Sequence, residues 1–498
     1  MSIGRSGLYI YISNMLNMVF GYVFWLLVAN FTGAEGPASV GVVSATISFS
    51  TMMSSVLLLG TPFGIQRFIG KEYAQNDFAS ISSLLASSMS LVLVLSILAS
   101  VIILAFGQQA ILLTKLPWEF LIASTILLIA LVIYQLLFSS LIAVSQSKFL
   151  LFGAIAQNAS KILIVILLLH AGYGLISIVI SYVASTLISL PLMSLAILRN
   201  IPIPHKITFI SDIRRLIKAS SVNWVPTIIS TIGAQLSVLV VLGYSGAAQA
   251  GEYYIASIVF SAAIAVPMAI INAAFPVMSA MTEQSKVLTS RIIKIGLIFS
   301  VPLSVILAIY SNDILKLLNP HFENASLPLI LFMIAVAPTV LNYGIYFMLY
   351  ALGKYRSVLI IGLSENVSKI ILYFILVPNF GAIGAVISFV SGPLIALAVI
   401  SITQKKHYSI AWKKVLLVVA IPLIVGLCIY LSKFGPFVGI PLVISSAFYL
   451  YIRFTMITVS ELREIIYSLL PEFLARKIYP RVEQVVRVIG QKDIFSDL

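Results

Sequence analysis

Long apolar runs follow one another along almost the whole chain and constrain its fold more than any other feature. A helix needs about 20 apolar residues to cross about 30 Å of hydrocarbon, and the chain holds fourteen such runs, from residues 7–31 to residues 436–454. Only 9% of the 498 residues are charged, compared with about 25% in soluble domains. The sequence therefore predicts an all-α polytopic membrane protein with about fourteen transmembrane helices. It argues against a nucleic-acid binder, although the net charge is +14.

The expected helices between these two ends are separated by short polar gaps. They lie at residues 38–65, 81–106, 118–143, 149–170, 174–198, 217–243, 250–278, 291–310, 325–352, 356–377, 381–403 and 413–432.

The Lys and Arg residues predict the orientation of these helices. If the N-terminus lies in the cytoplasm, 25 of the 30 fall in segments on the inner side, and only Lys115, Lys316 and Lys433 fall outside. Cytoplasmic loops of membrane proteins carry such an excess of Lys and Arg. We therefore expect a multi-pass protein with both termini in the cytoplasm. The membrane we expect it to span is the cell (plasma) membrane.

Part of the sequence is repeated. QNASKIL at 157–163 matches ENVSKII at 365–371, and VISYVAS at 179–185 resembles VISFVSG at 386–392. Six expected helices separate the copies, so both halves should have the same orientation and be related by a rotation of about 180° around the membrane normal. The expected parts are an N-terminal six-helix lobe (1–200), a basic cytoplasmic linker (201–216), a C-terminal six-helix lobe (217–404), two further transmembrane helices (405–454) and a cytoplasmic amphipathic tail (455–498).

The repeat contains two lysines that fall within apolar helices. Lys161 lies thirteen residues after Lys148, and Lys369 lies thirteen residues after Arg356. Thirteen helical residues span about 20 Å, which places both lysines near the middle of the bilayer. Charges at this depth are costly and usually line a functional cavity, although two lysines could also snorkel or pair with neighbouring helices as a purely structural feature.

The two copies differ in charge. Glu365 precedes Lys369 by four residues, so both lie on one helix face and can form an ion pair. The corresponding residue before Lys161 is the neutral Gln157. The three ionisable groups together carry one positive charge, which favours an anionic ligand over a cationic one.

Several other polar residues complete the candidate substrate-binding set. Within helices these are Asn158 and Asn366, which match in the repeat, together with Asn14 and Asn223. They could bind sugar hydroxyls, or they could form hydrogen bonds between helices. Arg67 follows the second helix, where it could meet a phosphate or simply anchor the inner side.

Two sequence phrases are similar to those of a known family. GTPFGIQRFIGKEYA at 60–74 and AAFPVMSAM at 273–281 resemble phrases of the polysaccharide/oligosaccharide flippases of the multidrug/oligosaccharidyl-lipid/polysaccharide (MOP) exporter superfamily. The resemblance covers about residues 1–405 and implies V-shaped lobes, alternating access, and transport of a lipid pyrophosphate-linked glycan to the outer leaflet. Such a protein is no enzyme and needs no metal or cofactor. We expect a monomer whose partners are this substrate and membrane lipids. Whether transport also uses a coupling cation stays open.

Two other functions stay open. One is a cation-coupled multidrug antiporter of the same superfamily, which would need a cavity carboxylate not paired with lysine. The other is a membrane glycosyltransferase or polymerase, which the short outer loops argue against. Glu365 is the only carboxylate within the expected helix cores, so proton coupling would involve it.

Overall fold

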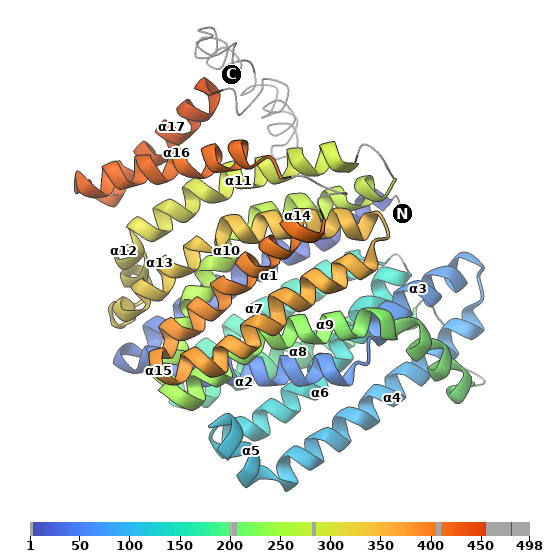
Figure 1. Cartoon of the computed structure of the whole chain (residues 1–498). Coiled ribbons are helices and arrows are strands. Elements are labelled where there is room, and N and C mark those ends of the chain that lie inside the picture. The colour runs from blue at the N-terminus through green and yellow to red at the C-terminus, as the bar shows by residue number, and fades with distance from the viewer. Residues whose placement is uncertain are drawn as a thin grey trace. The chain divides into compact units, whose positions relative to one another are not determined.

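The chain forms a large helical membrane protein. The computed structural model describes residues 3–144, 146–199, 201, 207–280, 285–404, 410–454 and 480, and these residues contain no strand (Figure 1). Twelve of their helices are long and apolar enough to cross a membrane. The predicted all-α polytopic fold is therefore confirmed, while residues 455–479 and 481–498 of the expected amphipathic tail lie outside the described residues.

The helices are named here in chain order. They are α1 (Ile3–Phe31), η1 (Gly33–Glu35), α2 (Gly36–Leu57), α3 (Thr61–Ala74), α4 (Phe78–Ala105), α5 (Gly107–Thr114), α6 (Trp118–Ala143), α7 (Lys148–His170), α8 (Ile176–Leu198), α9 (Phe209–Ser245), α10 (Ala247–Ala280), α11 (Ser285–Ile309), α12 (Ser311–Leu318), η2 (Pro320–Ala325), α13 (Ser326–Ile334), α14 (Val336–Ala351), α15 (Tyr355–Thr403), α16 (Trp412–Leu431) and α17 (Pro436–Arg453).

The fourteen expected spans all find a counterpart among these helices. The 49-residue α15 consists of two helices joined at Gly381, whose backbone is not helical. The segments Pro320–Ile334 and Val336–Ala351, bent by 41° at the break between them, are together long and apolar enough for one further span. Counting α15 as two spans and the bent pair as one brings the twelve helices of the described chain to fourteen.

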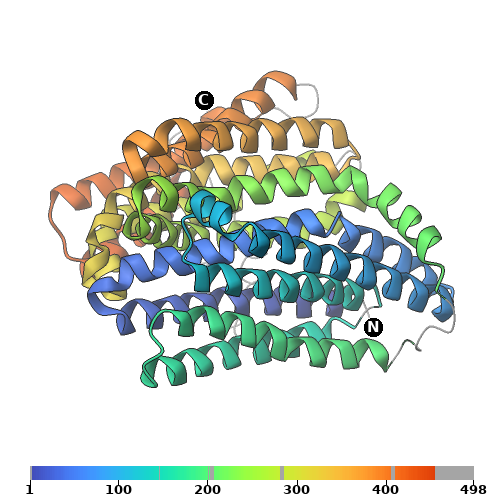
Figure 2. The ribbon, with the colours of Figure 1, turned by 90° about the horizontal axis from the view of Figure 1, so that it is seen from below.

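The chain divides into two compact units. Unit 1 contains Met1–Ala262, Ile314–Phe332 and Gly353–Ile400. Unit 2 contains Ala263–Asp313, Met333–Leu352 and Ser401–Leu498. In unit 1, α7 packs against α1 and α8, and α2 packs against α6 and α9. Figure 2 shows long blue to green helices of this unit lying side by side. Both candidate lysines belong to unit 1.

Both copies of the repeat are helical hairpins with a glycine at the turn. Gly174 precedes α8 with φ 59°, and Gly381 turns α15 with φ 54°. The two glycines are 207 residues apart, and glycine adopts this left-handed conformation without steric cost. A Cβ atom added to Gly392 would lie 2.9 Å from the Glu365 carbonyl oxygen. The second half of α15 therefore runs back along the first.

α2 and α10 cross at a pair of glycines whose contacts are reciprocal. A Cβ atom on Gly41 would lie 1.8 Å from the Ala247 carbonyl oxygen, and one on Gly251 would lie 1.8 Å from the Pro37 carbonyl oxygen. Each glycine thus contacts the residue four positions before the other. Reciprocal contacts of this kind are those of a local two-fold axis.

Two boundaries differ from the predicted ones. The expected helix 38–65 ends at Leu57, because Leu59 and Gly60 both adopt positive φ and α3 begins as a separate helix. At the other boundary, the linker expected at 201–216 is helical from Phe209 onward. Residues 202–206 of that linker are outside the described part of the chain. The separate helix α3 and the longer α9 form a contact described below.

Candidate functional site: two buried lysines

Lys161 is a buried cation surrounded by aromatic rings. It lies on α7 and is 7% exposed. Its Nζ atom is 4.7 Å from the ring centroid of Tyr182 on α8 and 5.1 Å from that of Phe24 on α1. Ring faces attract cations, and the attraction grows as the site loses water. In the described part of the chain, no carboxylate forms an ion pair with Lys161.

Lys369 is buried as well, but it has a carboxylate partner. It is 5% exposed, and its Nζ atom donates a hydrogen bond of 2.7 Å to Glu365 Oε1. The Nζ atom also lies 4.6 Å from the ring centroid of Phe389. The ion pair predicted from the i, i+4 spacing is thus confirmed. The difference in charge between the two lysine environments is present in the folded protein.

The aromatic partners of the two lysines correspond in the repeat. Tyr182 stands in VISYVAS where Phe389 stands in VISFVSG. The two ammonium-to-ring distances, 4.7 and 4.6 Å, are nearly equal. These rings were not predicted from the sequence, although both aligned phrases carry an aromatic residue at this place.

A chain of aromatic rings connects the two lysine environments through α10. On the Lys161 side, Trp25 contacts Tyr182 and Tyr254, with centroids 6.3 and 4.9 Å apart. The next residue, Tyr253, contacts Phe332 at 5.4 Å. Phe332 in turn lies 5.1 Å from Phe389, the ring beneath Lys369. Adjacent residues of one helix therefore reach both sites.

The paired asparagines lie beside the lysines and are held by local hydrogen bonds. The Nδ2 atom of Asn158 donates to the Ala154 carbonyl at 2.8 Å and to Asn17 Oδ1 at 2.6 Å. The equivalent atom of Asn366 donates to the Gly362 carbonyl at 2.9 Å. Both side chains are buried. Asn158 thus also links α7 to α1.

No described contact connects the other three candidate residues to either lysine. Asn14 on α1 is exposed, and Arg67 on α3 is exposed beside Phe68, with Cζ 5.8 Å from the ring centroid. The side chain of Asn223 lies outside the described residues. The roles expected for these three residues stay predictions.

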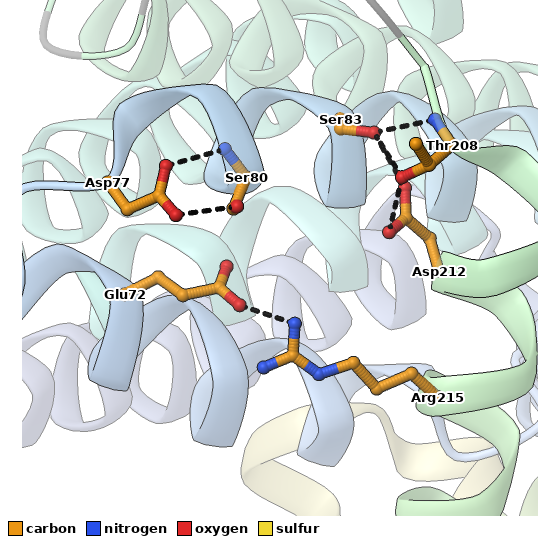
Figure 3. Close-up of polar contacts among 7 residues, drawn as sticks. All are labelled: Glu72, Asp77, Ser80, Ser83, Thr208, Asp212 and Arg215. Carbon is orange, nitrogen blue, oxygen red and sulfur yellow. Dashed lines mark hydrogen bonds and ion pairs between the residues drawn. The ribbon is translucent and has the colours of Figure 1, made fainter.

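A polar cluster joins the start of α9 to α3 and α4 (Figure 3). Arg215 Nη1 lies 2.5 Å from Glu72 Oε1, and the Arg215 guanidinium also lies 4.2 Å from the Phe68 ring centroid. The carboxylate of Asp212 accepts hydrogen bonds from Ser83 at 2.7 Å and from Ser87 at 2.9 Å. The Thr208 hydroxyl also donates a hydrogen bond of 3.1 Å to Asp212 Oδ1. We call this set the α9 clasp: Glu72, Ser83, Ser87, Thr208, Asp212 and Arg215.

The loop between α3 and α4 carries a separate capping interaction. Ser80 donates two hydrogen bonds to Asp77, one from its hydroxyl at 2.6 Å and one from its backbone N–H at 3.1 Å. These bonds stabilise the ionised carboxylate and lower the pKa of Asp77. Asp77 is thus the N-cap of α4.

The described fold is that of a multi-pass helical membrane protein. Residues 3–282, more than half of the chain, match the sequence profile of a family described as "Polysaccharide biosynthesis protein". The chain therefore belongs to this polysaccharide biosynthesis protein family. Comparison with curated protein sequences gives no match.

Solved structures share the fold at low sequence identity. The lipid II flippase MurJ in an inward closed conformation is 15% identical over 85% of this chain and 99% of its own, with a TM-score of 0.66. An inward-facing multidrug resistance MATE transporter of the MOP superfamily is 15% identical over 78% of this chain and 92% of its own, with a TM-score of 0.62. The MATE multidrug transporter DinF-BH is 16% identical over 82% of this chain and 96% of its own, with a TM-score of 0.58. These proteins are transporters and flippases rather than enzymes.

Proposed function

We propose that this protein is a flippase that moves a lipid (pyro)phosphate-linked oligosaccharide from the cytoplasmic to the outer leaflet by alternating access. The observation that carries the proposal is Lys161, a buried ammonium with no carboxylate partner in the described chain. Lys369 and Glu365 neutralise each other, so the two lysine sites together hold one uncompensated positive charge. A phosphate group is the part of such a substrate that this charge would bind.

The family supports the same choice of substrate class. The chain belongs to a polysaccharide biosynthesis family, and one solved structure with its fold is a lipid II flippase. The Lys and Arg distribution favours cytoplasmic termini, and we propose the plasma membrane as the location. We propose that Asn158 and Asn366, which lie beside the lysines, bind sugar hydroxyls during transport, and that Arg67 contacts the phosphate before it enters.

A cation-coupled multidrug antiporter is the second candidate, because MATE transporters share the fold. Such an antiporter needs a carboxylate that is free to bind a cation. Glu365, the carboxylate beside Lys369, is held in an ion pair. This pairing argues for the flippase.

Reconstituted vesicles test the proposal. Purified protein is incorporated into vesicles with a fluorescent lipid-pyrophosphate-linked oligosaccharide, and head groups that cross the bilayer are measured by a membrane-impermeant quencher. A flippase moves these head groups, whereas an antiporter instead moves a soluble cationic dye along an ion gradient. We expect Lys161→Ala to reduce head-group transport severely.

Lys148→Ala is the matched control for the loss of a positive charge. Lys148 begins the same helix, thirteen residues before Lys161, and its removal should leave transport close to that of the wild type. Transport is normalised to folded protein for all variants. Near-wild-type transport by Lys161→Ala would contradict the role of this ammonium, and dye transport without head-group transport would favour the antiporter.

A further inference from the structure

The ammonium of Lys161 occupies a corner formed by two perpendicular rings. The rings of Phe24 and Tyr182 have centroids 5.1 Å apart and an interplanar angle of 86°. Trp25 and Tyr254 extend the wall beyond Tyr182, through contacts of 6.3 and 4.9 Å. We call these four residues the aromatic box. Proteins that bind organic ammonium ligands use walls of this composition.

Within the aromatic box, the described contacts of the Lys161 ammonium are with the rings of Phe24 and Tyr182. No described residue forms an ion pair or a hydrogen bond with its Nζ atom, and the residue is buried. Lys369 differs, because a carboxylate and one ring hold its ammonium together. The Lys161 environment therefore has the chemistry of a receptor for an ammonium group, and the lysine itself fills it.

We propose that the aromatic box is a binding site for a primary organic ammonium ion, and that the protein keeps this site filled with its own Lys161. The tethered ammonium excludes free organic cations and presents a positive charge to anionic ligands instead. Lys161 thus determines the charge selectivity of the site. This inference concerns binding, so it stands or falls independently of the proposed transport activity.

The atoms that Lys161→Ala removes determine which small molecule is used to probe the aromatic box. Lys161→Ala removes Cγ, Cδ, Cε and Nζ, and n-propylammonium has the same four heavy atoms. n-Propanol has the same size without the charge, so a comparison of the two isolates the cation–π contribution. Binding is followed by ligand-observed NMR and by the shift of the thermal unfolding midpoint, with purified full-length protein at constant ionic strength.

We expect Lys161→Ala to bind propylammonium saturably and about tenfold more tightly than propanol, the ratio that a partly desolvated cation–π contact provides. The wild type should show no saturable binding, because its own ammonium occupies the site. Tyr182→Leu in the Lys161→Ala background should abolish the preference for the charged probe. The matched control is Glu365→Gln/Lys369→Ala, which opens space next to the single ring of Phe389. It should bind propylammonium about tenfold more weakly than Lys161→Ala does.

Three results would overturn the inference. These are a folded Lys161→Ala variant that binds no propylammonium, equal affinities for propylammonium and propanol, and a preference that Tyr182→Leu leaves unchanged. If Lys161→Ala does not fold in ordinary buffer, propylammonium present during purification should restore folded protein and propanol should not. Failure of this rescue would also contradict the proposal.

Discussion

The Nζ atom of Lys369 lies 4.6 Å from the ring centroid of Phe389, on the other arm of the same helical hairpin. The repeat preserves this relationship, because Lys161 lies 4.7 Å from the ring of Tyr182 on the following helix. Only the first copy lacks a carboxylate one turn before the lysine, where Gln157 donates a hydrogen bond to Thr186 at 3.2 Å. The same lysine–ring arrangement therefore occurs twice: Glu365 neutralises it at Lys369, and it stays positively charged at Lys161.

Removal of the two lysines should affect stability unequally. Lys369→Ala leaves Glu365, whose side chain is 17% exposed, without its partner. Breaking a buried pair from one side costs about 3–5 kcal/mol, and the partial exposure of Glu365 places the expected loss near the lower value. Lys161→Ala strands no opposite charge, so its loss of stability should be smaller. Unfolding in detergent, followed by circular dichroism, measures both.

The double variant Glu365→Gln/Lys369→Met is the control for this prediction. It removes both charges together, and replacement of a complete buried ion pair is often neutral. The double variant should therefore be more stable than Lys369→Ala. If it is equally destabilised, the stranded charge of Glu365 is not the cause.

Gly392 should be difficult to replace, because it makes room for the Lys369 side chain. A Cβ atom at this position would lie 2.2 Å from Lys369 Cε and 2.9 Å from the Glu365 carbonyl oxygen. Overpacking of this kind costs about 1–3 kcal/mol, so Gly392→Ala should lower the unfolding midpoint clearly. The first copy has Ser185 at this position. Ser185→Ala should be tolerated, and equal effects of the two substitutions would argue against the close approach.

Sequence patterns predicted the helices and the Lys369–Glu365 pair because both depend on short spacings. Apolar runs of membrane-spanning length mark helices directly, and residues four apart share a helix face. The Phe389 ring was missed because its position beside Lys369 depends on how the hairpin turns at Gly381. Correspondence within the repeat could have indicated it, since both copies carry an aromatic residue at that place.

The α9 clasp could not be predicted from sequence for a different reason. Arg215 and Glu72 are 143 residues apart, and no local pattern connects them. From the sequence alone, Arg215 is one of the many basic residues that favour a cytoplasmic loop. The break at Leu59 and Gly60 was also missed, because the apolar run continues through it into the segment that became α3.

The α9 clasp should contribute measurably to stability. Glu72 is 6% exposed and Arg215 is 41% exposed in their side chains, so solvent screens the pair partly. A double-mutant cycle with Glu72→Ala and Arg215→Ala should give a coupling of about 0.5–3 kcal/mol. The neighbouring Arg214, which is exposed on α9, supplies the matched control. Coupling of equal size between Glu72 and Arg214 would contradict the observed pairing.

The reciprocal crossing of α2 and α10 should respond to substitution in a non-additive way. The Cβ of Gly41→Ala would lie 1.8 Å from a backbone oxygen, as would that of Gly251→Ala. Because backbone cannot move aside as a flexible side chain does, each single variant should lower the free energy of unfolding by about 1–3 kcal/mol or more.

Combining the two substitutions distinguishes a shared crossing from two independent contacts. Once the helices have separated to accept one methyl group, the second fits at little further cost, so the double variant should be much less destabilised than the sum of the singles. Gly21→Ala on α1 is the control, because no described atom outside the neighbouring backbone of α1 lies within 4 Å of a Cβ at that position. It should be neutral or stabilise by about 0.5–1 kcal/mol, as alanine does in helices. Additive losses in the double variant would show that the two glycines do not share one crossing.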